Sequence, residues 1–229
     1  MEFLYELKLW TYNKPEIYFL FRKLFLKENG LEFGKLTRIV IEGFPRSANT
    51  YSVVVVEEFL KNKVHIAHHL HNPCQIICGL KNNISCYLLI RKPVDAISSY
   101  VIRNNVSVRY GLKDYIRFYD TLINYKERLH VIEFEKLINN PRLIVDDLII
   151  TQGDIIKKDL GREVDNEEIF TQIEEISVKN FSKLSEKEVA RPSEGRQKLK
   201  QRVIDEIYSK KYEFLLERAN ALYKAFTKK

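Results

Sequence analysis

The loop at residues 43–51 holds residue types that bind anions. It follows a short β-branched run and precedes a helical stretch, so it lies where a strand ends and a helix begins. The Walker phosphate-binding pattern fits only in part, because Ala48 stands at its second Gly and Asn49 at its Lys. Backbone N–H groups, the Thr50 hydroxyl and the Arg46 guanidinium can still hold a phosphate group. Hydrolysis of a nucleoside triphosphate is disfavoured by the missing Lys.

A second polar pattern follows a later apolar strand. Arg91 stands just after the strand predicted at 85–90, and Ser99 lies in the helix that follows. Their guanidinium and hydroxyl can hold one small dianion between them. The alternative is that Arg91 and Asp95 form an ion pair at a helix start and that Ser99 is an ordinary helix serine.

Together the two patterns resemble the donor-binding motifs of sulfotransferases that use 3′-phosphoadenosine-5′-phosphosulfate (PAPS). The family's loop reads close to P-K-S-G-T-T-W, and this chain has P-R-S-A-N-T-Y, with Arg46, Ala48 and Tyr51 at the Lys, Gly and Trp positions. The segment from Arg91 to Tyr100 matches R-x-P-x-D-x-x-x-S-Y at every fixed position. A weaker similarity covers residues 131–137.

The resemblance implies transfer of a sulfuryl group from PAPS to a hydroxyl or amine of a carbohydrate, glycolipid or small-molecule acceptor. It assigns the 5′ side of the donor to Arg46, Ser47, Ala48, Asn49, Thr50 and Tyr51, and the 3′-phosphate to Arg91 and Ser99. Arg46 is also expected to stabilise charge on the departing phosphate. No metal is required, since the transferred sulfonate carries less charge than a phosphoryl group.

Histidines between the two motifs are candidates for the general base. Four of the five histidines in the chain lie there, within or just after the strand predicted at 64–67. The resemblance places His69 at the family's catalytic position, with His71 and then His68 as the next candidates. One base suffices, so at least two of these residues must serve packing or the surface.

A metal site is the rival interpretation of this segment. His69, His71, Cys74 and Cys78 follow one another at spacings close to those of zinc ligands. The cysteines are expected on an apolar helix, however, where a free thiol behaves as a small hydrophobic group. We therefore predict no metal site.

Positive charge concentrates at the end of the chain. The net charge is +7, and residues 183–229 contain thirteen Lys/Arg against seven Asp/Glu. Such a basic face fits an anionic ligand, but charge alone does not identify it. By the resemblance, Arg191 and Arg196, in a loop predicted at 190–196, are further candidates to contact the 3′-phosphate; the alternative is that both are surface arginines.

The elements that must position these residues alternate along the chain. Strands are predicted at 37–42, 64–67, 85–90 and 130–133, and helices at 50–61, 73–80, 93–101 and 112–128. This alternation indicates a parallel sheet with helices on both faces. The predicted fold class is α/β: a three-layer α/β/α arrangement with a central parallel sheet, a P-loop-like phosphosulfate-binding loop, and helical N- and C-terminal extensions. At the C-terminal end, an amphipathic stretch is predicted at 197–226 whose shared face holds Val203, Ile207, Phe214, Leu215 and Leu222.

Length and composition favour a single folded domain. With 229 residues and 45% hydrophobic residues, the chain can bury a sizeable core. We divide it into an aromatic helical arm at 1–34, an α/β core with the donor site at 35–150, and a basic helical part at 151–229.

The aromatic arm and the cysteines bear on location. The first 33 residues hold nine aromatic residues, which favours docking of the arm on the protein's own core; contact with a membrane surface is the alternative. Three cysteines without a secretory leader predict a cytoplasmic protein, peripheral to the inner face of the membrane if the arm makes that contact. We expect no nucleic-acid partner.

Two other functional classes stay open at this level. A P-loop kinase or other nucleotide-binding protein would share the strand, loop and helix around residue 46. A non-catalytic protein that binds an anionic polymer would use the basic C-terminal part.

Overall fold

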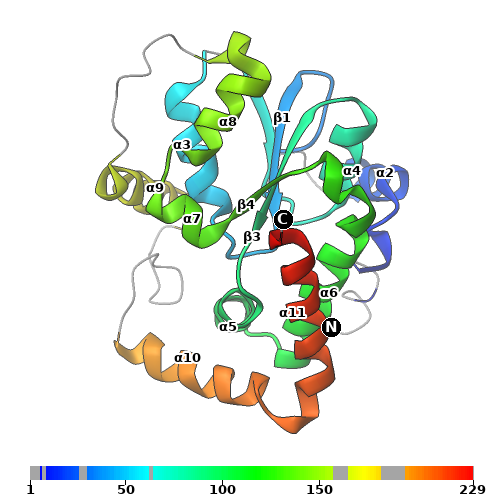
Figure 1. Cartoon of the computed structure of the whole chain (residues 1–229), viewed down its shortest axis with the longest axis vertical. Helices are drawn as coiled ribbons and strands as arrows, with labels where there is room; N and C mark the ends of the chain where they lie inside the picture. Colours follow the sequence, from blue (N-terminus) through cyan, green and yellow to red (C-terminus); the bar gives the residue numbers. More distant parts are fainter. Residues whose placement is uncertain are drawn as a thin grey trace.

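In the described part of the chain, the central sheet has four parallel strands. The computed structural model describes residues 6, 9–25, 30–61, 64–156, 165–181 and 194–228. The strands are β1 (Thr37–Gly43), β2 (His65–His68), β3 (Ser85–Ile90) and β4 (His130–Glu133). They lie in the order β2-β1-β3-β4, and each neighbouring pair is parallel (Figure 1). The predicted α/β class with a parallel sheet is confirmed.

The chain changes direction across the sheet between β1 and β3. Strand β2 pairs with one edge of β1, and β3 pairs with the other. The loops that leave the carboxyl ends of β1 and β3 therefore diverge, and ligands of open parallel sheets bind at such a point. Arg46 and Arg91, which the sequence singles out, follow these two strands.

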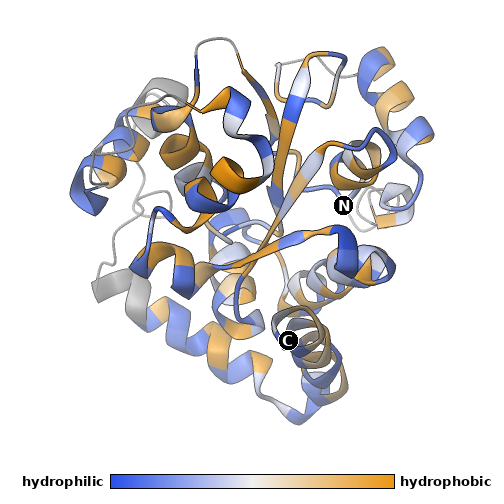
Figure 2. Ribbon diagram, turned by 45° about the horizontal axis from the view of Figure 1, so that its top comes forward, coloured by the Kyte–Doolittle hydropathy of each residue, from blue (hydrophilic) through white to orange (hydrophobic). Residues whose placement is uncertain are grey.

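Alternating strand residues divide the core into two halves. Ile39 and Ile41 belong to one buried cluster and Val40 to the other, as the period of two in a strand requires. Helices α3 (Asn49–Phe59), α8 (Leu143–Gln152) and α9 (Asn166–Phe181) cover the first face. Helices α4 (Cys74–Lys81), α5 (Pro93–Asn104), α6 (Val108–Leu122) and α11 (Glu213–Thr227) cover the second. Figure 2 shows strands mainly in the hydrophobic colour between helices that carry both colours, which is consistent with three layers.

Most element boundaries lie close to their predicted positions. Strands β3 and β4 have the predicted bounds, and β2 is displaced by one residue. Helix α6 begins at Val108 rather than at Leu112, because Ser107 caps it: Tyr110 N donates to Ser107 Oγ at 3.3 Å. The end of this predicted helix is a separate 3-10 helix, η1 (Ile123–Arg128).

The amphipathic stretch predicted at 197–226 is divided between two helices. Helix α10 (Glu194–Ile207) packs against α5, and after the short η3 (Lys210–Tyr212) the chain continues as α11. The break between them shifts the helical phase. Ile207 and Leu222 are buried but Phe214 is 78% exposed, so the prediction that the three share one face is wrong.

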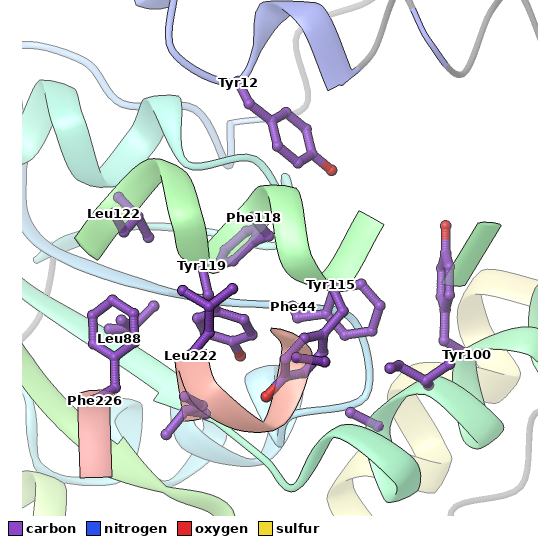
Figure 3. Packing of buried hydrophobic residues seen from close by; sticks show 14 of the residues in the cluster. Tyr12, Phe44, Leu88, Tyr100, Tyr115, Phe118, Tyr119, Leu122, Leu222 and Phe226 are labelled. Atoms are coloured by element: carbon purple, nitrogen blue, oxygen red, sulfur yellow. The ribbon is translucent and has the colours of Figure 1, made fainter. Parts of the chain in front are cut away.

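The N-terminal arm joins the larger core cluster through Tyr12. Its ring meets Phe118 of α6 edge-on at 6.1 Å, and Figure 3 shows Tyr12 on the side of α6 opposite to α11. Docking of the arm on the core is thus confirmed for this residue. The following helix, α2 (Pro15–Phe25), has only 11 residues, and no described helix is long and apolar enough to cross a membrane.

Candidate anion-binding and catalytic site

The loop after β1 is held in a constrained backbone conformation. Gly43 lies so close to β3 that a Cβ atom there would come within 2.5 Å of the Leu89 carbonyl oxygen, so only glycine fits. Arg46 and Ala48 both adopt left-handed backbone angles, with φ of 72° and 70°. Such conformations cost energy for residues with a Cβ and concentrate at functional sites.

Polar groups of this loop lie around the start of α3. Ser47 N donates to Phe44 O at 3.2 Å, and Asn49 Nδ2 donates to the same oxygen at 3.2 Å. The buried Ser47 Oγ makes no hydrogen bond of ordinary geometry within the described residues, although the Tyr119 hydroxyl lies nearby. Ala48 is the N-cap residue of α3, and its methyl side chain cannot accept a hydrogen bond from the N–H groups at the start of the helix. The first N–H groups of α3 therefore point toward a position where an anion is favoured.

The two sequence motifs meet at this loop. Arg46 Nε donates to Ser99 Oγ at 2.9 Å, and Arg91 Nη1 donates to the Arg46 carbonyl oxygen at 3.0 Å. The Arg91 guanidinium also lies 3.8 Å from the centre of the Phe134 ring, and its own carbonyl accepts a hydrogen bond from Tyr115 at 2.8 Å. Two guanidinium groups and a hydroxyl are thus gathered beside the N-terminus of α3.

Tyr51 is directed elsewhere. Its hydroxyl donates to Asn166 Oδ1, and its ring lies 5.8 Å from the Phe170 ring. Both partners belong to α9, so the Tyr51 side chain connects α3 to α9.

His69 reaches the same loop from the end of β2. Its Nε2 lies 2.9 Å from Thr50 Oγ1, and its Nδ1 is hydrogen-bonded to Nδ1 of His68. One consistent arrangement has Thr50 donating to Nε2 while the Nδ1 proton of His69 is donated to His68. In that tautomer Nε2, the ring nitrogen of His69 that faces the loop, carries no proton. A general base requires such an unprotonated nitrogen.

Burial keeps the two adjacent imidazoles neutral. Burial, together with smaller contributions from the charges of His71 and Arg103, lowers the pKa of His69 to about 3. Burial likewise lowers the pKa of His68 to about 3, with smaller contributions from neighbouring histidines. Both rings are therefore unprotonated at pH 7, the state that a general base must have, and the low pKa makes each a weak proton acceptor in the protein without ligand.

His71 and His65 have different surroundings. His71 Nδ1 lies 3.0 Å from the Gly43 carbonyl oxygen, so this ring is anchored to β1. His65 binds Thr37 Oγ1 and Gly30 O through its two ring nitrogens, at 3.0 and 2.8 Å. His69, in contrast, contacts a side chain of the candidate anion loop, the Thr50 hydroxyl.

The cysteines do not join the histidines in a cluster. Cys74 and Cys86 are buried and reduced; the Cys74 thiol donates to Thr11 O at 3.1 Å. Burial raises the pKa of each of these thiols to about 12, far from the thiolate form that binds zinc. Among the described residues, no group of three or more His, Cys, Asp or Glu side chains is arranged to hold a metal ion.

The predicted contact of the basic part with this site is only partly described. Arg191 lies outside the described residues, as do the predicted loop residues 190–193. Arg196 belongs to α10 rather than to a loop, and its side chain is not among those described. Lys200 of α10 does reach α5, where its Nζ lies 2.8 Å from Asp95 Oδ1.

The sequence analysis missed Glu42, a buried acid at the end of β1. Its Oε1 accepts hydrogen bonds from Leu70 N at 2.7 Å and Gln75 Nε2 at 2.9 Å, and its Oε2 accepts one from His71 N at 3.1 Å. These bonds fix the backbone on the C-terminal side of His69. The available signal was an acidic residue in an otherwise apolar strand, since acids are almost never fully buried without partners.

Arg103 was missed as well. It lies one helical turn after Ser99 on α5, close enough to His69 for its charge to lower the pKa of that ring. The i, i+4 spacing from Ser99 was the available signal.

Replacement of Glu42 by glutamine should change how stability depends on pH. Burial raises the pKa of Glu42 from 4.5 to about 7, so between these values the folded state binds more protons than the unfolded state. The contribution of protonated Glu42 to the free energy of unfolding is complete below pH 4.5 and is lost as the pH rises through 7. Relative to Glu42→Gln, the wild-type free energy of unfolding should fall by about 3 kcal/mol over this interval.

Chemical denaturation at a series of pH values measures this difference. The matched control is Glu58→Gln, which removes one negative charge from a half-buried acid that accepts a hydrogen bond from Gln172. For each variant, the difference in free energy of unfolding from wild type is plotted against pH. A steeper slope for Glu42→Gln than for Glu58→Gln reports the raised pKa of Glu42. A difference between wild type and Glu42→Gln that is constant with pH would contradict the raised pKa.

Comparison with known proteins returns no match to this chain, either among family models or among curated proteins. The function of the site is accordingly inferred from its own residues.

Proposed function

We propose that the chain is a PAPS-dependent sulfotransferase that transfers a sulfuryl group to a hydroxyl or amine of a carbohydrate or small-molecule acceptor. The observation that carries this proposal is the 2.9 Å hydrogen bond between Arg46 and Ser99, which are 53 residues apart. Each belongs to a different motif that resembles a donor-binding motif of this family. A nucleotide with phosphate groups on both sides of its ribose can use both motifs only if they adjoin.

The charges of the gathered residues suit such a donor. Arg46 and Arg91 bring guanidinium groups, which bind phosphate and sulfate oxygens in pairs. The N–H groups at the start of α3 and the hydroxyls of Ser47 and Thr50 add neutral donors. Ser99 and Arg91 would hold the 3′-phosphate, and the loop from Arg46 to Thr50 would hold the 5′ side.

The proton chemistry follows from the position of His69. When bound, PAPS supplies a sulfuryl group activated by its bond to a phosphate. His69 Nε2, which faces Thr50 in this structure, is placed to accept the proton of an acceptor hydroxyl beside the loop. The Nδ1 contact with His68 orients the ring, and the Glu42 hydrogen bonds hold the backbone that follows it. Arg46 counters negative charge on the phosphate side.

Ligand-induced stabilisation tests the proposal. Adenosine 3′,5′-bisphosphate without Mg²⁺, at about 100 times its Kd, is expected to add about 2.7 kcal/mol and to raise Tm by about 5–10 °C. A thermal melt measures the shift. Stabilisation by ATP with Mg²⁺ but not by the bisphosphate would favour a kinase instead, and stabilisation by neither would remove the donor site.

A second comparison of ligands tests whether Ser99 binds the 3′-phosphate. In wild type, the bisphosphate should shift Tm more than adenosine 5′-phosphate does, whereas in Ser99→Ala the two ligands should differ less. Ser98→Ala is the matched variant, because Ser98 is buried next to Ser99 but donates to the Asp95 carbonyl oxygen at 3.4 Å. Equal loss of discrimination in both variants would contradict the assignment of Ser99.

A further inference from the structure

Helix α2 presents a continuous apolar face to the outside of the protein. The large hydrophobic residues on this face recur at the helical period and are 44–69% exposed. They are Ile17, Leu20, Phe21, Leu24 and Phe25. Trp10, the only tryptophan of the chain, precedes the helix and is 46% exposed. We call these six residues the outer apolar face.

The opposite side of α2 is attached to the protein. Pro15 is buried, and α2 packs against α4, beside which it lies in Figure 1. Glu16 forms an ion pair with Lys81 of α4 at 2.9 Å, and Arg22 forms one with Glu32. The helix is therefore fixed in orientation, and its outer apolar face is a stable feature of the surface.

Two described lysines lie next to this face. Lys14 stands at the start of α2, with its Nζ 3.5 Å from the centre of the Trp10 ring, and Lys23 is exposed beside the apolar residues. Glu16, the one acid within α2, is already paired with Lys81. An anionic surface that covers the outer apolar face would thus meet two lysines whose charge α2 itself does not balance.

The size of the face favours a membrane over a second copy of the chain. An 11-residue helix is about 16 Å long, whereas a stable dimer buries about 800 Å² on each partner. A lipid surface needs no complementary protein shape. It accepts Phe, Leu and Ile among the acyl chains, Trp at the level of the headgroups, and Lys beside anionic lipids.

We infer that α2 is an interfacial helix that binds the protein to anionic membrane surfaces through its outer apolar face. This inference goes beyond the proposed enzymatic function and does not depend on it. Binding to vesicles can be measured without any sulfuryl donor or acceptor.

Fluorescence of Trp10 reports the binding directly. With vesicles of phosphatidylcholine and phosphatidylglycerol in equal parts, we expect a blue shift of Trp10 emission and co-sedimentation of the full chain. With phosphatidylcholine alone, binding should be weaker by about tenfold or more, since Lys14 and Lys23 then meet no anionic headgroup. Equal binding to both vesicle types would overturn the anionic specificity.

Two Phe→Ser substitutions test whether vesicle binding depends on the outer apolar face or on any exposed hydrophobic side chain. Phe25→Ser removes a residue that is 69% exposed on α2, and Phe214→Ser removes one that is 78% exposed on α11. Phe25→Ser should weaken vesicle binding by about tenfold, while Phe214→Ser should leave it unchanged. Equal effects, or no vesicle binding together with a concentration-dependent dimer in sedimentation equilibrium, would overturn the inference.

Discussion

Replacement of Arg46 by alanine is expected to lower turnover by about 10²- to 10³-fold, the loss typical of removing one preorganised donor from developing negative charge. Arg46 is the residue through which both motifs are connected: its Nε donates to Ser99, and its carbonyl oxygen accepts from Arg91. The variant removes the first bond and the guanidinium. It keeps the backbone carbonyl, so Arg91 retains that partner.

The fold should survive this change. Arginine and alanine both have a Cβ, so the cost of the left-handed backbone at φ 72° is similar in the two proteins. Turnover with PAPS and the Kd of adenosine 3′,5′-bisphosphate by calorimetry are the measurements. Arg38→Ala is the control, since Arg38 is an exposed arginine of β1 that pairs with Asp154 at 2.8 Å. Turnover of Arg46→Ala equal to that of Arg38→Ala would remove Arg46 from the site.

The sheet could be predicted from the sequence because its strands are short apolar runs separated by helical patterns. The run at 85–90 is buried on both faces, and this burial demands the continuous hydrophobic sequence that is seen there. The order of the strands could not be predicted in this way. It depends on which edge of β1 receives β2 and which receives β3, and the alternation of elements is the same for either choice.

The residues of the candidate site could be predicted from the sequence, but the hydrogen bonds between them could not. The resemblance named Arg46, Ser99 and His69, yet the hydrogen bonds from Arg46 to Ser99 and from Thr50 to His69 join residues far apart in the chain. Only the packing of α5 and the end of β2 against the β1 loop creates them. Glu42 escaped notice because its role lies in bonds to the backbone of Leu70 and His71, which no side-chain pattern reveals.

Amphipathic periodicity was the least reliable guide to burial. The pattern put Phe214 on one face with Ile207 and Leu222, but the helix breaks between Ile207 and Phe214, and Phe214 is exposed while the other two are buried. In α2 the periodicity marks an apolar face that the structure leaves outside. A helical period identifies which residues share a face, and the partner of that face must come from tertiary structure or from another surface.

The second large effect concerns His69, which we expect to act as the base. His69 has a left-handed backbone, with φ of 59°, and asparagine tolerates this conformation better than most residues. His69→Asn therefore keeps the backbone and a polar side chain near Thr50, but its amide cannot accept the proton. Turnover should fall by about 10²- to 10⁴-fold, the usual contribution of a positioned base.

His71→Asn is the matched variant, because His71 also has a left-handed backbone, with φ of 49°, and lies two residues away. Its ring is bonded to the Gly43 carbonyl oxygen rather than to Thr50, so its loss should lower turnover far less than the loss of His69. Both variants should retain the Tm shift with adenosine 3′,5′-bisphosphate, which separates proton transfer from donor binding. A larger loss in His71→Asn than in His69→Asn would transfer the role of base to His71, and full turnover in both would mean that neither imidazole accepts the proton.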